Sequence, residues 1–193
     1  MFDGTVVAIT GASSELGAAA ALAFAERGAA VALAARRADR LAALAREIED
    51  EGGRALALPT DVADERQARA FVEHAYEHLG RLDVLVNAAA AGLEGPVAGG
   101  DTERWRRALA VNLMGVLYCT HAALPVMRAH GGGRIVNVAC ARDGVSPLGA
   151  LTRGAIDAFS AALAEEVGAL GVRVAVVAPG GAEEILAAAA PGP

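Results

Sequence analysis

Short apolar runs alternate along the chain with longer segments in which apolar positions recur at helical spacing. The short runs are nearly continuous in Val, Ala, Leu and Ile, which is typical of parallel strands covered on both faces. They predict strands at 5–10, 30–35, 55–58, 84–87, 134–139 and 172–178. The segments between them predict helices at 15–27, 39–51, 64–79, 102–129 and about 152–170.

This alternation predicts one α/β domain, a doubly wound parallel sheet of the Rossmann type in a three-layer α/β/α arrangement. Right-handed crossovers between parallel strands give the order 3-2-1-4-5-6. We expect residues 1–186 to form this domain and residues 187–193, mostly alanine and proline, to be a loose tail. Ligands of such sheets bind beyond the carboxyl ends of the strands, where the strand order changes direction.

Composition narrows the classes of function. The 193 residues are 54% apolar and carry a net charge of -6, which disfavours nucleic acid or an anionic membrane as the partner. No signal peptide is visible and only two cysteines are present, so we expect a cytoplasmic protein. An uncharged segment, 108–127, has the length of a membrane span, but its asparagine, histidine and proline favour a buried helix. The histidines and cysteines show no metal-ligand spacing, so no metal site is predicted.

The segment 10–17 reads TGASSELG directly after the first apolar run. A buried strand, a tight glycine turn and a helix start together place unpaired N–H groups where the phosphates of a dinucleotide bind. Glu15 stands where a third glycine is expected and puts a negative charge near that anion site. The alternative is an ordinary strand-to-helix turn with a serine N-cap. The candidate cofactor contacts of this turn are Gly11, Ser13, Ser14, Glu15 and Leu16.

Further motifs follow in the order and spacing of one family. They are Arg36-Arg37 after the second strand, Asp61-Val62 after the third, Asn87-Ala88-Ala89-Ala90 after the fourth, Asn112 in the long helix, GRIVNV at 133–138, and Pro179-Gly180 after the sixth strand. With TGASSELG they resemble the short-chain dehydrogenase/reductase family over nearly the whole chain. That resemblance implies hydride transfer between NAD(P) and a small alcohol or carbonyl.

The resemblance also implies a cofactor preference. NAD-specific members carry an acidic residue at the position of Ala35, which is followed here by Arg36 and Arg37. Guanidinium groups at this place would bind the 2′-phosphate, so we expect NADP(H) rather than NAD(H). The alternative is that both are surface arginines. Asp61 matches the position that contacts adenine in the family, and the alternative is a helix-start turn with Asp64 as N-cap. The remaining cofactor positions implied by the resemblance are Val62, Asn87, Pro179 and Gly180.

The catalytic half of the resemblance is incomplete. Members use an Asn, a Ser, a Tyr and a Lys, and the lysine lowers the pKa of the tyrosine phenol that transfers the proton. The matching positions hold Asn112, Cys140, Gly149 or Leu151, and Arg153. The chain contains no lysine, and its two tyrosines lie in other predicted helices. A phenol with a pKa of about 10 is a poor base at neutral pH without a neighbouring cation.

Two departures lie outside this catalytic set. Glu184 falls where members place a threonine that binds the nicotinamide carboxamide. If Pro193 is the natural end, the substrate-covering segment and a seventh strand are missing.

Cys140 would be a nucleophile if His121 or Arg142 activated it, but a packed thiol is the favoured interpretation.

Three functions are therefore open: an NADP(H)-dependent oxidoreductase that works poorly, a non-catalytic pseudoenzyme that acts as a binding or assembly subunit, and a pocket reused for a non-redox reaction such as cyclisation or isomerisation. The pseudoenzyme explains best why the departures fall together on cofactor and proton-transfer chemistry. The resemblance gives the oxidoreductase as the family label. Members dimerise through helices that correspond to 102–129 and 152–170, so we expect a homo-oligomer.

Overall fold

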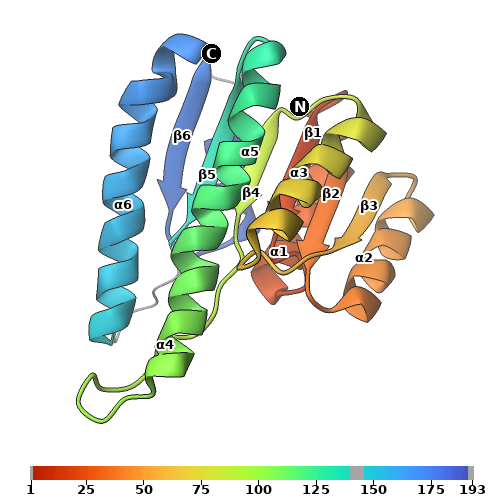
Figure 1. Ribbon diagram of the computed structural model, residues 1–193. Helices are drawn as coiled ribbons and strands as arrows, with labels where there is room; N and C mark the ends of the chain where they lie inside the picture. The colour runs from red at the N-terminus through yellow and green to blue at the C-terminus, as the bar shows by residue number, and fades with distance from the viewer. Residues whose placement is uncertain (1, 140–145, 191–193) are drawn as a thin grey trace.

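The computed structural model describes residues 2–139 and 146–190, which form three layers around one parallel sheet (Figure 1). The sheet has the order β3-β2-β1-β4-β5-β6, which confirms the predicted fold class and topology. Its strands are β1 (Val6–Thr10), β2 (Ala30–Ala35), β3 (Arg54–Pro59), β4 (Val84–Asn87), β5 (Gly133–Val138) and β6 (Val172–Val177). The helices are α1 (Glu15–Glu26), α2 (Ala38–Asp50), α3 (Glu65–Leu79), α4 (Thr102–Leu109), α5 (Gly115–Ala129), α6 (Pro147–Val167) and α7 (Ala182–Ala189).

Two apolar clusters hold the layers together. One joins the sheet to α1, α2 and α7 and includes the buried side chains of Phe24, Ile48 and Ile185. The other joins the opposite face of the sheet to α3, α5 and α6 and includes Phe71 and Met127. Each such side chain contributes about 1.5 to 3 kcal/mol when it is fully buried. These clusters fix the relative positions of the strands, and therefore also the positions of the loops that leave their carboxyl ends.

The long helix predicted over 102–129 is present but is not uniform. One π-helical turn, Ala110–Met114, joins α4 to α5. By length and composition, Thr102–Ala129 is the one helix of the described residues that is able to cross a membrane, and 39% of its apolar window is buried in the protein. It lies along the sheet beside α3 and α6 (Figure 1).

The C-terminal third differs from the sequence prediction in two places. α6 begins at Pro147 instead of residue 152, because the Ser146 hydroxyl accepts the N–H of Gly149 at 3.1 Å and proline suits the first helical turn. α7 was not predicted, and it includes residues 187–189 of the expected loose tail. The tail prediction is therefore wrong for these residues. The side chains that α7 buries against the core are Ile185, Leu186 and Ala189.

Candidate functional site

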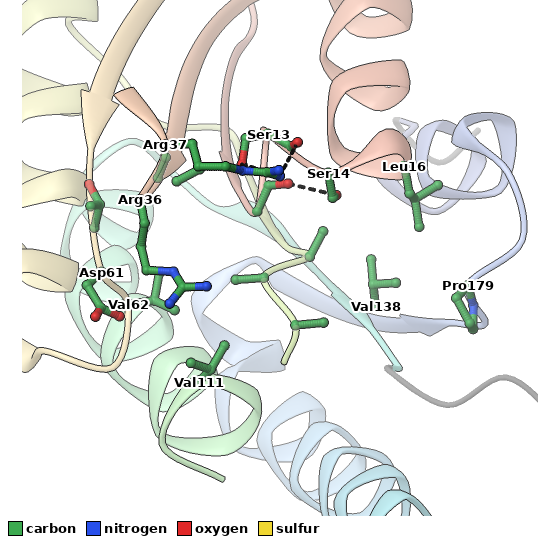
Figure 2. Close-up of a pocket in the computed structure, with 17 residues that line it drawn as sticks. Ser13, Ser14, Leu16, Arg36, Arg37, Asp61, Val62, Val111, Val138 and Pro179 are labelled. Carbon is green, nitrogen blue, oxygen red and sulfur yellow. Dashed lines mark hydrogen bonds between the residues drawn. The ribbon is translucent and has the colours of Figure 1, made fainter. Parts of the chain in front are cut away.

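A cavity of about 390 Å³ lies at the carboxyl ends of the strands, where the strand order reverses between β1 and β4 (Figure 2). We call it the carboxyl-end cavity. Nine predicted cofactor positions line it: Gly11, Ser13, Ser14, Leu16, Arg36, Arg37, Asp61, Val62 and Pro179. The lining residues that sequence analysis did not assign as contacts are Ala34, Ala35, Thr60, Ala88, Ala89, Ala90, Val111 and Val138.

The glycine turn after β1 keeps the close backbone contacts that a dinucleotide site requires. Gly11 has a φ of +71°, and a Cβ there would lie 2.5 Å from the carbonyl oxygen of Ala88. The Thr10 hydroxyl accepts the N–H groups of Ala88 and Ala89 at 3.1 and 3.2 Å, so β1 also holds the loop that follows β4. Gly17 packs directly on the backbone of Gly11. Side chains are therefore excluded at Gly11 and Gly17 on steric grounds.

Glu15 begins α1 and is exposed, and it is not one of the residues that line the carboxyl-end cavity. The turn is capped by Ser14, whose hydroxyl accepts the Gly17 N–H at 3.1 Å and donates to the Gly11 carbonyl at 2.8 Å. A carboxylate in the first turn interacts favourably with the helix dipole. One turn thus serves both as a helix cap and as a wall of the cavity, with the Glu15 charge outside that wall.

The two arginines after β2 have different environments. The Arg37 guanidinium folds onto Ser13, with Nη2 2.6 Å from the carbonyl oxygen and Nε 3.2 Å from the hydroxyl. Within residues 2–139 and 146–190, Arg36 forms no ion pair or side-chain hydrogen bond, and Figure 2 shows its guanidinium reaching into the cavity. Arg36 is therefore the arginine that is free to bind an anion.

Asp61, which matches the adenine-contacting position, already has protein partners. Its Oδ2 lies 2.7 Å from Nη2 of Arg107 on α4, and its Oδ1 accepts the Ala63 N–H at 3.1 Å. Val62 beside it is buried and lines the cavity. These contacts tie the turn after β3 to α4, and the Arg107 guanidinium offsets the negative charge at this side of the site.

Asn112 lies at the centre of the π-helical turn and is 2% exposed. Its Oδ1 accepts the Ala91 N–H at 2.7 Å, and its Nδ2 donates to the Ala91 carbonyl at 2.9 Å. Both ends of the amide therefore bind the loop that follows β4. π-Helical turns occur frequently at functional sites. Asn112 positions the segment that forms one wall of the carboxyl-end cavity.

Asn87 is in the sheet interior and does not line the cavity. Its Nδ2 donates to Oδ1 of Asn137 at 2.9 Å, and Asn137 in turn donates to the Ser160 hydroxyl at 2.9 Å. Within the described part of the chain, Asn87 Oδ1 has no hydrogen-bond partner although it is buried. These side chains link β4, β5 and α6 beneath the site.

The positions that match the catalytic Tyr and Lys fall on α6. Gly149 and Leu151, the alternative Tyr positions, and Arg153 at the Lys position all lie outside the cavity lining. Arg153 is exposed and its Nε lies 3.8 Å from a carboxylate oxygen of Asp157. Tyr76 and Tyr118, the only tyrosines of the chain, lie on α3 and α5. No phenol lines the cavity within the described residues, and the chain contains no lysine.

The cysteine hypotheses have different outcomes. Cys140 and Arg142 lie outside the described residues. Cys119 is fully buried in α5, and burial raises the pKa of its thiol to about 12, so this thiol is not a nucleophile at neutral pH. His121 is exposed. Among the described residues, no three His, Cys, Asp or Glu side chains are grouped so as to hold a metal ion.

Glu184 lies in the first turn of α7, close to the segment that follows β6. Its carboxylate packs against Gly180, in the space that a Cβ at Gly180 would occupy. The neighbouring Pro179 lines the cavity. A negative charge thus stands beside the wall where the family resemblance implies a threonine.

The fold and the cavity define a Rossmann-type domain with its ligand site at the carboxyl ends of the strands. The family model for short chain dehydrogenases matches residues 5–189. The chain is 40% identical over 203 aligned positions to the cis-4-hydroxycyclohexanecarboxylate dehydrogenase of Sinomonas cyclohexanicum, covering 98% of this chain and 78% of the relative. The chain therefore belongs to the short-chain dehydrogenase/reductase family of oxidoreductases.

Solved structures agree with this assignment. A metagenomic short-chain oxidoreductase in complex with NADP has a TM-score of 0.88 at 31% identity, over 96% of this chain and 90% of that one. An NAD+-bound xylitol dehydrogenase has a TM-score of 0.86 at 28% identity, over 92% of this chain and 70% of that one. Structural neighbours thus include complexes with both nicotinamide dinucleotides.

Proposed function

We propose that the protein binds NADP(H) in the carboxyl-end cavity and catalyses hydride transfer poorly or not at all. One contrast carries the proposal. The cavity keeps the glycine turn after β1 and the unpaired Arg36, whereas no phenol of the described residues lines it and the chain has no lysine. The protein is in this view a member of an oxidoreductase family that retains cofactor binding without the usual proton transfer.

The residues present fit a dinucleotide. The Gly11 turn lines the cavity, and the close approach of the Ala88 backbone leaves no room for a Cβ at Gly11. α1 begins at this turn, and its N-terminal N–H groups favour phosphate. When bound, the nicotinamide cofactor supplies or accepts the hydride. The chain's own residues bind and orient it.

The preference for NADP(H) over NAD(H) rests on the end of β2. Ala35 lines the cavity without a carboxylate, and Arg36 has no acidic partner among the described residues. Arg37 is already held by Ser13 and therefore positions the turn. Hydrogen bonds to a charged group contribute about 1.5 to 3 kcal/mol, which corresponds to a preference for the 2′-phosphorylated cofactor of about tenfold to a hundredfold.

The proposal of weak turnover rests on the residues at the family's Tyr and Lys positions, which supply neither a phenol nor an amine. Arg153 carries a positive charge, but a guanidinium does not act as a neutral base or donate a proton usefully near pH 7. It is also exposed and paired with Asp157, and neither of the alternative Tyr positions, Gly149 and Leu151, carries a phenol. A small alcohol or carbonyl remains the substrate class to examine, and cis-4-hydroxycyclohexanecarboxylate, the substrate in the name of the Sinomonas relative, is the first probe.

Calorimetric titration tests the cofactor part of the proposal. The wild-type chain, Arg36→Ala and the control Arg46→Ala are titrated with NADPH and with NADH. Arg46 is an exposed residue of α2 outside the cavity, so its removal changes the net charge by the same amount.

We expect NADPH to bind the wild type with micromolar affinity, and Arg36→Ala to lose about tenfold to a hundredfold for NADPH with little change for NADH. Arg46→Ala should match the wild type. Equal losses for both cofactors would reject the 2′-phosphate role of Arg36. Absence of binding at millimolar NADPH would reject the proposed function.

A further inference from the structure

A second cavity, of about 270 Å³, lies at the opposite end of the sheet from the cofactor cavity. It is found at the amino ends of β5 and β6, the upper ends of these strands in Figure 1. We call it the amino-end cavity. Half of its lining residues are glycines, so backbone forms much of its wall. The lining residues are Asp83, His130, Gly131, Gly132, Gly133, Arg134, Gly171 and Arg173.

Two arginines of adjacent strands line this cavity. Arg134 of β5 and Arg173 of β6 are register neighbours, so their side chains project from the same face of the sheet. No carboxylate of the described residues forms an ion pair with either one. Burial and then the charge of Arg173 lower the pKa of Arg134, an effect that Asp83 opposes without cancelling.

Asp83 is the only acidic residue in the cavity lining, and its carboxylate is already engaged. Arg81 donates to it through Nε at 2.8 Å and Nη2 at 2.7 Å, and the Val6 N–H donates at 2.8 Å. The charge of Asp83 is therefore offset by Arg81. This leaves two like charges on adjacent strands, an arrangement that destabilises a sheet.

We infer that the amino-end cavity is a binding site for a small tetrahedral oxyanion of the phosphate class, held between Arg134 and Arg173. Planar guanidinium groups donate paired N–H bonds to phosphate oxygens, so two of them on one face match a tetrahedral anion. A doubly charged anion also relieves the repulsion between the two arginines. This site is separate from the proposed cofactor site, which lies beyond the other ends of the strands.

Phosphate binding to the full chain tests this inference, measured by calorimetry at constant ionic strength with chloride as the balancing anion. The variants are Arg134→Gln, Arg173→Gln, the matched surface control Arg46→Gln, and Arg36→Ala, which reports on phosphate in the cofactor cavity. Thermal unfolding of each variant is followed in chloride and in phosphate, so that loss of folding is distinguished from loss of binding.

We expect phosphate affinity to fall at least about tenfold in Arg134→Gln and in Arg173→Gln, and to change by less than about twofold in Arg46→Gln. In chloride, Arg173→Gln should unfold at the same temperature as the wild type or higher, because it removes a repulsion. In phosphate, the wild type should unfold at a higher temperature than Arg173→Gln. The inference is overturned by absence of binding at tens of millimolar phosphate. It is equally overturned if affinity is lost in Arg36→Ala but kept in Arg173→Gln.

Discussion

Replacing Asn112 by alanine should loosen the loop that forms one wall of the carboxyl-end cavity. The side chain makes two hydrogen bonds to the backbone of Ala91, of 2.7 and 2.9 Å. Ala91 is partly exposed, so water replaces the lost partners in part and the net value of about 1 kcal/mol per bond applies. The expected loss is about 2 kcal/mol, a large share of the roughly 5 to 15 kcal/mol by which a domain is stable.

Urea unfolding measures this loss. With a denaturant slope of about 2 kcal/mol per molar, the midpoint should fall by about 1 M. Met114→Ala is the matched control, since Met114 belongs to the same π-helical turn but is 39% exposed. Cleavage after Glu94 by a glutamate-specific protease should quicken in Asn112→Ala alone. A midpoint shift below about 0.2 M, or equal shifts in both variants, would refute the assignment of Asn112 as the anchor of this loop.

Three further predictions concern other parts of the chain. Burial raises the pKa of the Cys119 thiol to about 12, so Cys119 should resist iodoacetamide at mildly alkaline pH until urea unfolds the protein. Labelling of Cys119 in the folded protein would contradict this. Hydrogen bonding by the Gln67 N–H lowers the pKa of Asp64, the N-cap of α3, so its stabilisation is present above an unfolded pKa of about 4 and is lost as the pH falls through the lower folded value. Asp64→Asn should flatten this acid limb of the unfolding temperature, and an unchanged limb would exclude Asp64 as its cause. Leu151, 56% exposed on α6, should lie in a dimer interface, so Leu151→Arg should yield monomers in light scattering. A wild-type monomer at micromolar concentration would reject that interface.

Local patterns along the chain were sufficient to predict the sheet. Each strand is a nearly continuous apolar run, and its neighbours follow from right-handed crossovers. Gly11 was also identifiable, because a tight turn between a buried strand and a helix requires a residue without a Cβ. The start of α6 also has a local signal, since Ser146 followed by Pro147 is a typical helix start.

Other features of the sites depend on contacts between residues far apart in the sequence. Arg36 and Arg37 are equivalent in the sequence, and only the fold shows that Arg37 binds Ser13, 24 positions away. Likewise, the pairing of Arg134 with Arg173 follows from the register of β5 and β6. α7 is a short alanine-rich segment without a strong periodic pattern, and its packing against α1 defines it as a helix.

We propose that this chain keeps cofactor binding but lacks turnover. The decisive measurement follows NADPH oxidation by absorbance with a panel of small ketones and aldehydes, on protein that calorimetry shows to be saturated with NADPH. We expect the bound NADPH to be oxidised no faster than in a control without enzyme. A turnover within the ordinary range of about 1 to 1000 per second would contradict it, because a proton donor other than the family's phenol would then be at work.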